Sequence, residues 1–162
     1  FIGKQEADVL AVGKKVYVDA VEAKARIYPG DDGTFLHPAD AFKKAMEKAV
    51  KGKKFGRVSA PGCIKSSIFI TEPMVTVLDE KGNPAKEYTI DRRSVVNPSN
   101  KARVLRCRPC FPKWSMEIAL EVDRALMTRQ QVVEALSLAG RIIGIGDYRP
   151  EKGGGFGRFK VE

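Results

Sequence analysis

Arginine and lysine side chains cluster in one stretch of the sequence, from Lys81 to Lys113. This stretch holds nine basic and two acidic residues, which makes it the most basic part of a chain with net charge +9. Guanidinium groups bind phosphate oxygens in pairs, and each neutralised phosphate releases counterions. The stretch therefore predicts salt-dependent contacts to a nucleic-acid backbone, with a solvated basic hairpin as the alternative. The residues expected to make these contacts are Arg92, Arg93, Lys101, Arg103, Arg106 and Arg108.

A second candidate is the glycine-rich stretch from Gly144 to Gly157. Glycines let a backbone approach a phosphate with successive amides facing it, and aromatic rings can stack on bases. The stretch lacks the Gly-Lys-Ser/Thr triplet and following helix of a nucleotide-hydrolysing loop. A flexible connector is the alternative. The predicted contacts are Gly146, Tyr148, Arg149, Lys152, Gly155, Phe156 and Arg158, and Lys53, Lys54 and Arg57 form a secondary basic patch.

Other reactive side chains give weaker signals. His37 is the only histidine and could act as a general acid or base in RNA cleavage, although a residue before Pro38 is more often part of a turn. Cys107 and Cys110 have the spacing of half a zinc site, but a zinc ion needs two further ligands. We therefore expect no metal, no cofactor and no catalysis.

Composition limits the class of protein. A chain of 162 residues that is 43% hydrophobic is long enough to bury a core, and we expect a single domain over 1–162. The net positive charge favours an anionic partner. No apolar run reaches the roughly 18 residues of a membrane span. Three cysteines, an odd number, fit a reducing compartment, so we expect a cytoplasmic protein with no membrane partner.

Two helices are predicted from apolar periodicity. The first runs over Pro38–Lys51, with Pro38 in its first position and Gly52 as its stop. The second runs over Arg129–Ala139, with Thr128 as the N-cap and Gly140 in the left-handed position that ends it.

Strands are predicted from β-branched residues and from alternation. The clearest is Trp114–Val122, and further strand signals are Val16–Val18, Ile64, Ile68, Ile70, Met74–Leu78 and Phe156–Val161. A mobile basic loop is predicted over Gly52–Ser59. Together these elements predict an α+β fold. We expect a ferredoxin-like or RRM-like antiparallel sheet with two helices on one face and 81–113 as an inserted basic β-hairpin.

Two segments resemble a known family. Gly33–Ala45, where a glycine, an apolar pair and a proline precede a helix, resembles the corresponding segment of the repeat-associated mysterious protein (RAMP) superfamily. The loop that ends in Gly155–Phe159 resembles that superfamily's glycine-rich loop. The stretch from Ser94 to Phe159 is also similar to uncharacterised phage and prophage proteins. The similarities cover about half the chain. The sequence departs from the family in one respect, because little of it lies between these two family-like segments to form a second domain.

The resemblance implies an RNA-binding domain like the backbone subunits of CRISPR effector complexes, which polymerise along a guide RNA. It implies that 81–113 lies where those subunits carry a protruding hairpin, and that copies of the chain associate with one another. Some members are endoribonucleases that use histidine, which would be His37 here.

The sequence therefore predicts a non-enzymatic protein that binds single-stranded RNA, or single-stranded DNA, through sugar–phosphate contacts with little sequence preference. The alternatives are a RAMP-type endoribonuclease and a phage protein that binds another protein.

Overall fold

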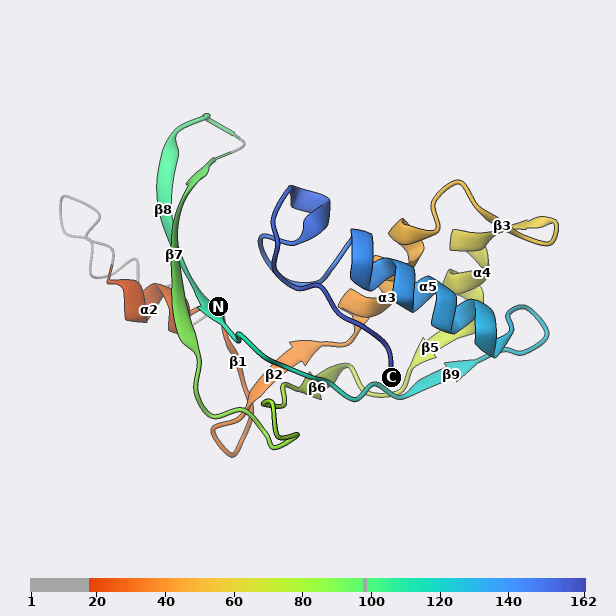
Figure 1. The fold of residues 1–162 in the computed structure, drawn as a ribbon, viewed down its shortest axis with the longest axis horizontal. Coiled ribbons are helices and arrows are strands. Elements are labelled where there is room, and N and C mark those ends of the chain that lie inside the picture. The colour runs from red at the N-terminus through yellow and green to blue at the C-terminus, as the bar shows by residue number, and fades with distance from the viewer. Residues whose placement is uncertain (1–17, 98) are drawn as a thin grey trace. The chain divides into compact units, whose positions relative to one another are not determined.

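The structure is a computed structural model that describes residues 18–97 and 99–162 (Figure 1). These residues contain four α-helices and several short antiparallel strands, so the chain is a mixed α+β protein. They divide into two compact units. We call them the hairpin unit (18–37 and 76–117) and the helical unit (Pro38–Val75 and Ile118–Glu162).

The hairpin unit is built around one long β-hairpin. Strand β7 (Thr89–Val96) pairs antiparallel with β8 (Arg103–Cys110) along their full lengths, and helix α2 (Asp19–Lys24) packs against β8. The predicted basic hairpin is thus confirmed, but it spans 89–110. Residues 79–83 instead form a turn in which the Asp79 carboxylate accepts the Lys81 and Asn83 amides.

Short strands flank this hairpin in the sequence. Strands β1 (Tyr28–Pro29), β2 (Phe35–Pro38) and β6 (Met74–Thr76) form a three-stranded sheet in the order β1-β2-β6. Pro38 ends β2 and does not open the following helix, which corrects the prediction for this residue. Because proline has no amide hydrogen, it fits the end of a short strand as well as the start of a helix.

The helical unit has three helices around its core. Helix α3 (Asp40–Ala49) packs against both α4 (Ala60–Ser67) and α5 (Arg129–Ile142) (Figure 1). The two predicted helices are confirmed as α3 and α5. Thr128 caps α5 as predicted, because its hydroxyl accepts the Gln131 amide at 3.2 Å while the Gln131 side chain accepts the Thr128 amide. The core is formed mainly by Phe42, Met46, Cys63, Ile64, Ile68, Met127, Val132, Ala135 and Ala139.

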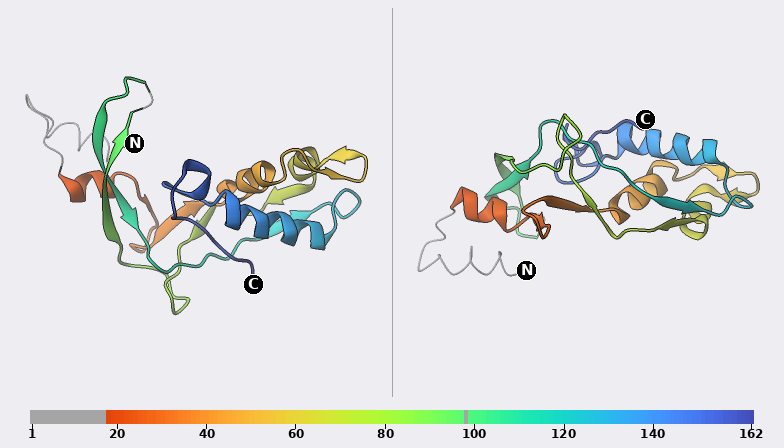
Figure 2. Two further views of the ribbon diagram at one scale, coloured as in Figure 1. Left: turned by 45° about the horizontal axis from the view of Figure 1, so that its top comes forward. Right: turned by 90° about the horizontal axis from the view of Figure 1, so that it is seen from below.

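Two predictions before and within α4 are wrong. Ile64 lies in this helix and not in a strand. The segment predicted as a basic loop forms a β-hairpin of β3 (Lys54–Phe55) and β4 (Val58–Ser59), which projects beyond the helices of its unit (Figure 2). Its two-residue loop begins with Gly56 at φ +62°, as a type II′ turn requires. Ser59 then caps α4 by accepting the Gly62 amide.

Only part of the predicted strand over Trp114–Val122 pairs with another strand. Strand β9 (Leu120–Val122) pairs antiparallel with β5 (Ile68–Ile70), and Ser115 forms an isolated bridge with Leu78. The predicted alternation is nevertheless present, because the apolar side chains from Trp114 to Val122 are half-buried and those between them are exposed. Burial therefore follows the period of two even where no strand pairing occurs.

The C-terminal segment is not a strand, so the prediction for Phe156–Val161 is wrong. Its Phe159 ring packs against Phe42, with centroids 5.2 Å apart, and its amide donates to Gly140. Gly140 does not end α5, which continues to Ile142, and Gly144 at φ +72° follows in its place. Of the predicted strand Val16–Val18, residues 16 and 17 lie outside the described residues, and Val18 is the N-cap of α2.

The described strands form one three-stranded and three two-stranded sheets. The single larger sheet of a ferredoxin-like fold is therefore not confirmed. None of the helices in the described ranges has the length and apolar character needed to cross a membrane.

Gly140 gives a test of this packing. Gly140→Ala normally favours a helix by about 1 kcal/mol. Here the added Cβ would lie 2.1 Å from the Phe159 carbonyl oxygen, so we expect a loss of about 1–3 kcal/mol in the free energy of unfolding, measured with urea. Ser137→Ala in the same helix is the control and should change stability by less. A stabilising Gly140→Ala would contradict the contact.

Candidate nucleic-acid interface

A buried carboxylate holds helix α2 on the basic hairpin. Glu22 is only 7% exposed. Its Oε1 accepts hydrogen bonds from Arg106 at 3.2 Å and Arg26 at 3.3 Å, and its Oε2 accepts the Cys107 amide at 3.0 Å. A buried charge is costly unless it is paired and hydrogen-bonded, and these three donors meet that requirement. Arg106 therefore has a structural partner within its own unit.

Two more hairpin arginines have acidic partners. Arg93 lies directly opposite Arg106 in the strand register, a like-charge arrangement that destabilises a sheet. Its Nε donates to both Asp91 carboxylate oxygens, at 2.8 and 2.7 Å. Arg92 forms a longer ion pair of 3.5 Å with Asp19, and its side chain is 60% exposed. Three of the predicted phosphate ligands are thus neutralised within the hairpin unit.

The remaining predicted hairpin ligands differ in accessibility. Lys101 lies at the turn, where it has φ +58°, and Arg103 follows at the start of β8. Both are exposed, and neither side chain forms a hydrogen bond or ion pair within the residues described. Arg108 is half-buried in β8 opposite Asp91. Residues 18–37 and 76–117 together hold eleven basic and nine acidic residues, so the hairpin unit is only weakly positive.

The helical unit carries most of the net charge. It has fifteen basic and nine acidic residues, a net charge of +6. No aspartate or glutamate occurs between Glu47 and Glu72, whereas six lysines and arginines do. The excess of cations is therefore concentrated in the sequence that forms the end of α3, the β3–β4 hairpin and α4.

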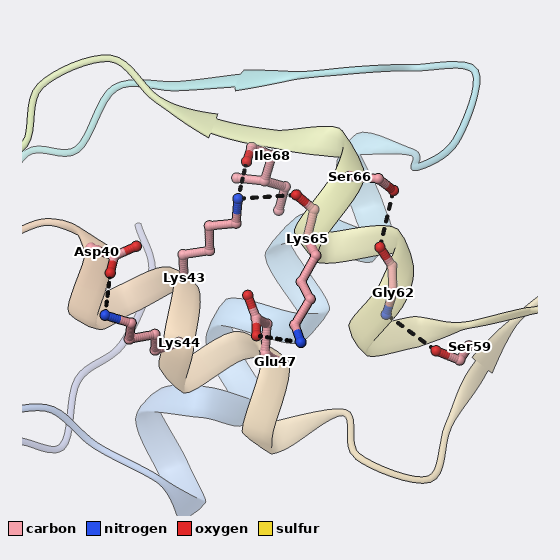
Figure 3. A network of polar contacts seen from close by, with 9 residues as sticks. All are labelled: Asp40, Lys43, Lys44, Glu47, Ser59, Gly62, Lys65, Ser66 and Ile68. Atoms are coloured by element: carbon pink, nitrogen blue, oxygen red, sulfur yellow. Dashed lines mark hydrogen bonds and ion pairs between the residues drawn. The ribbon is translucent and has the colours of Figure 1, made fainter.

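Four lysines of helices α3 and α4 have partners. Figure 3 shows Lys43 donating to the carbonyl oxygens of Lys65 and Ile68, where α4 ends. Figure 3 also shows the ion pairs Lys44–Asp40 and Lys65–Glu47. The Asp40 carboxylate raises the pKa of the Lys44 ammonium. Lys48 binds Glu151 of the glycine-rich loop at 2.8 Å.

Of the six cations between Glu47 and Glu72, the other four are exposed and form no side-chain hydrogen bond or ion pair with any residue described. We call them the β3–β4 patch: Lys51, Lys53, Lys54 and Arg57. The backbone that carries them is ordered, since Lys53 donates to Val50 and accepts the Ala60 amide at 3.0 Å. The patch includes the three predicted secondary residues. Lys51 was not predicted to bind phosphate. The lack of acidic residues near it in the sequence could have identified it as a further candidate.

The glycine-rich loop is closely packed. The Ile145 amide donates to Gly157, and the Phe156 amide donates to Tyr148 at 3.1 Å. A Cβ added at Gly154 would lie 1.8 Å from the Tyr148 carbonyl oxygen, and one at Gly157 would lie equally close to that of Ile145. The loop therefore requires glycine at these positions and is not a flexible connector. Gly146 and Gly155 have open space around them.

The charged side chains of this loop divide into two groups. Arg149 donates to Glu151 and to the Gly146 carbonyl, so this predicted phosphate ligand is held within the loop. Lys48 first, and then Arg149, lower the pKa of Glu151. Lys152 and Arg158 are exposed, and their side chains form no polar contact with described residues. These two are the predicted loop cations that remain available to an anion.

Two aromatic side chains of the loop are also accessible. Tyr148 and Phe156 meet edge to face with centroids 5.7 Å apart, and they are 40% and 37% exposed. Tyr148 has φ +54°, a left-handed conformation that costs an ordinary residue about 1–2 kcal/mol. The loop thus holds a partly exposed aromatic residue in a strained backbone position.

The weaker chemical signals of the sequence, His37 and the pair of cysteines, lie in strands β2 and β8. His37 is half-buried in β2. Within residues 18–97 and 99–162, no three His, Cys, Asp or Glu side chains are placed to hold a metal ion. Cys107 is buried and Cys110 half-buried, and their spacing of three in one strand points them to opposite faces.

The chain matches no protein-family model, no curated protein and no solved structure. The resemblance to the RAMP superfamily therefore stays a prediction. The structure assigns the predicted ligands to two sets. The arginines of β7 and β8 belong to the hairpin unit, while the β3–β4 patch and the glycine-rich loop belong to the helical unit.

Removing the Glu22 charge tests the anchor of α2. Glu22→Gln would leave the half-buried Arg106 guanidinium and the buried Cys107 amide poorly paired, and we expect unfolding to become easier by about 1–3 kcal/mol in urea titrations. Asp19→Asn, in the same helix, removes the charge that pairs with the more exposed Arg92 but keeps an amide oxygen that can accept from the Cys107 thiol, so it should cost less than about 1 kcal/mol. Equal effects of the two substitutions would contradict this account.

Thiol labelling tests the burial of β8. Burial first, and then the Asp19 carboxylate, raise the pKa of the Cys107 thiol from 9.0 to about 11. At pH 8 its reactive thiolate is thus about a hundredfold scarcer than in an unshifted thiol. We expect a thiol-reactive dye to label Cys110 before Cys107, with Cys107→Ser identifying the slow site by mass spectrometry. Equal labelling rates in the folded protein would rule out a buried Cys107.

Proposed function

We propose that this protein binds single-stranded nucleic acid, RNA in preference to DNA, through sugar–phosphate contacts centred on the β3–β4 patch. The supporting observation is that four neighbouring cations are exposed, lack acidic partners in the described chain and lie in a unit of net charge +6. Phosphate contacts carry no sequence information by themselves, so little sequence preference is expected.

Further parts of the surface support the same proposal. Lys152 and Arg158 add two accessible cations to the helical unit, and Lys101 and Arg103 add two to the hairpin unit. The paired arginines Arg92, Arg93 and Arg106 contribute less, because a phosphate would have to compete with their carboxylates. The β3–β4 patch is therefore proposed as the main contact and the long hairpin as an accessory one.

The proposal extends to family and assembly. The segment Gly33–Ala45, which leads into α3, and the glycine-rich loop after α5 support the proposal that this chain is related to the RRM-like domains of the RAMP superfamily. A cytoplasmic location and association of copies along one strand belong to the same proposal, since an extended strand offers repeated equivalent sites. Sedimentation with oligonucleotides of increasing length measures whether copies assemble on the strand.

Charge removal from the β3–β4 patch tests the proposal. In filter binding to single-stranded RNA, single-stranded DNA and duplex, Lys53→Gln/Lys54→Gln/Arg57→Gln should bind more weakly than the unchanged protein. Each lost phosphate contact lowers the slope of log K against log salt by about 0.7 for single strands, so the slope should fall by about 2. RNA length is monitored in the same samples to separate binding from cleavage.

The matched control carries the same change in charge. Lys24→Gln/Lys81→Gln/Lys86→Gln alters three exposed lysines of the hairpin unit and should leave the salt slope nearly unchanged. If both triple variants weaken binding equally, only the overall charge matters and the patch is not the site. If no oligonucleotide binds at low salt, an acidic protein partner becomes the better explanation of the patch.

A further inference from the structure

The backbone of the glycine-rich loop sets the position of its two aromatic rings. The Phe156 amide donates to the Tyr148 carbonyl, which links the two residues directly. The Gly154 backbone packs against that same carbonyl so closely that no side chain fits there. The ring pair is thus positioned by a rigid loop and lies at its surface.

The backbone conformation of Tyr148 is unusual for a tyrosine. The loop contains six glycines between Gly144 and Gly157, and glycine adopts φ +54° with little strain. A tyrosine occupies this position although the residue is 40% exposed, so burial of its ring does not fully account for the choice of an aromatic residue there. Strained residues of this kind cluster at ligand sites.

We infer that Tyr148 and Phe156 form a subsite on which an unpaired base of the bound strand stacks. This inference rests on the function proposed above. A base offers a flat π face to an aromatic ring, and Lys152 and Arg158 of the same segment can meet the flanking phosphates. Phosphates alone do not distinguish a single strand from a duplex, whereas a stacking ring requires a base that is free of its partner. The pair would supply the preference for single strands.

An abasic strand separates base stacking from phosphate binding. We compare an oligonucleotide that carries bases with one of equal length whose central residues are abasic. The unchanged protein should bind the base-bearing strand at least about fivefold more tightly, the lower end of what one stacked base contributes. Tyr148→Leu/Phe156→Leu should bind both strands alike. Phe69→Leu, which alters a 55% exposed aromatic in the same unit, should keep the preference.

A second variant and a spectroscopic measurement cover the case in which the double substitution harms folding. Gly154→Ala keeps both rings but places a Cβ 1.8 Å from the Tyr148 carbonyl oxygen, so it should abolish the preference for bases. In the unchanged protein, 2-aminopurine within the strand should lose fluorescence on binding and recover it when the ring pair is removed.

The outcomes distinguish this inference from the function on which it rests. Equal binding of base-bearing and abasic strands, with binding still dependent on Lys53, Lys54 and Arg57, overturns the stacking subsite and leaves the proposed function intact. Absence of binding to either strand overturns both. A preference for bases that survives Tyr148→Leu/Phe156→Leu places the stacking site elsewhere and also refutes the inference.

Discussion

The structure of the basic hairpin depends on the buried Glu22 carboxylate. Strands β7 and β8 place Arg93 opposite Arg106, and two such cations would repel each other without nearby acids. Glu22 binds Arg106 and the Cys107 amide from helix α2, while Asp91 binds Arg93. The arginines that make this stretch conspicuous in the sequence are therefore partly structural. Basic residues can stabilise a hairpin by forming ion pairs with acidic side chains, so not all of them need to bind phosphate.

The location of acidic residues thus decides which cations are available to a ligand. In the helical unit, Asp40, Glu47 and Glu151 pair with lysines of α3 and α4. The β3–β4 hairpin contains no acidic residue, and its charged residues are all cations. The ion pair between Lys48 and Glu151 also connects α3 to the glycine-rich loop. The helical unit thus contains both the β3–β4 patch and the exposed rings of Tyr148 and Phe156.

Local signals predicted the elements that depend on local interactions. The capping box at Thr128, the apolar stripe of α3 and the strand pair of the basic hairpin are all readable from neighbouring residues. Helix α4 was missed because Pro61 and Gly62 resemble turn residues, although both are tolerated in a first helical turn. The alternation after Trp114 predicted burial correctly, but strand pairing requires a partner that the pattern does not specify.

The candidate site was predictable only where its residues act without distant partners. Lys53, Lys54 and Arg57 were named as candidates because they lie close together in the sequence, and no described acidic residue pairs with them in the structure. Arg106 was assigned to phosphate because its partner, Glu22, lies 84 residues away in the sequence. Arg149 was also assigned to phosphate although its partner, Glu151, lies only two residues away. A cluster of basic residues in the sequence therefore overestimates the phosphate-binding surface wherever the fold brings acidic side chains next to those residues. A basic hairpin that no acidic side chain contacts, such as β3–β4, is a better candidate for that surface.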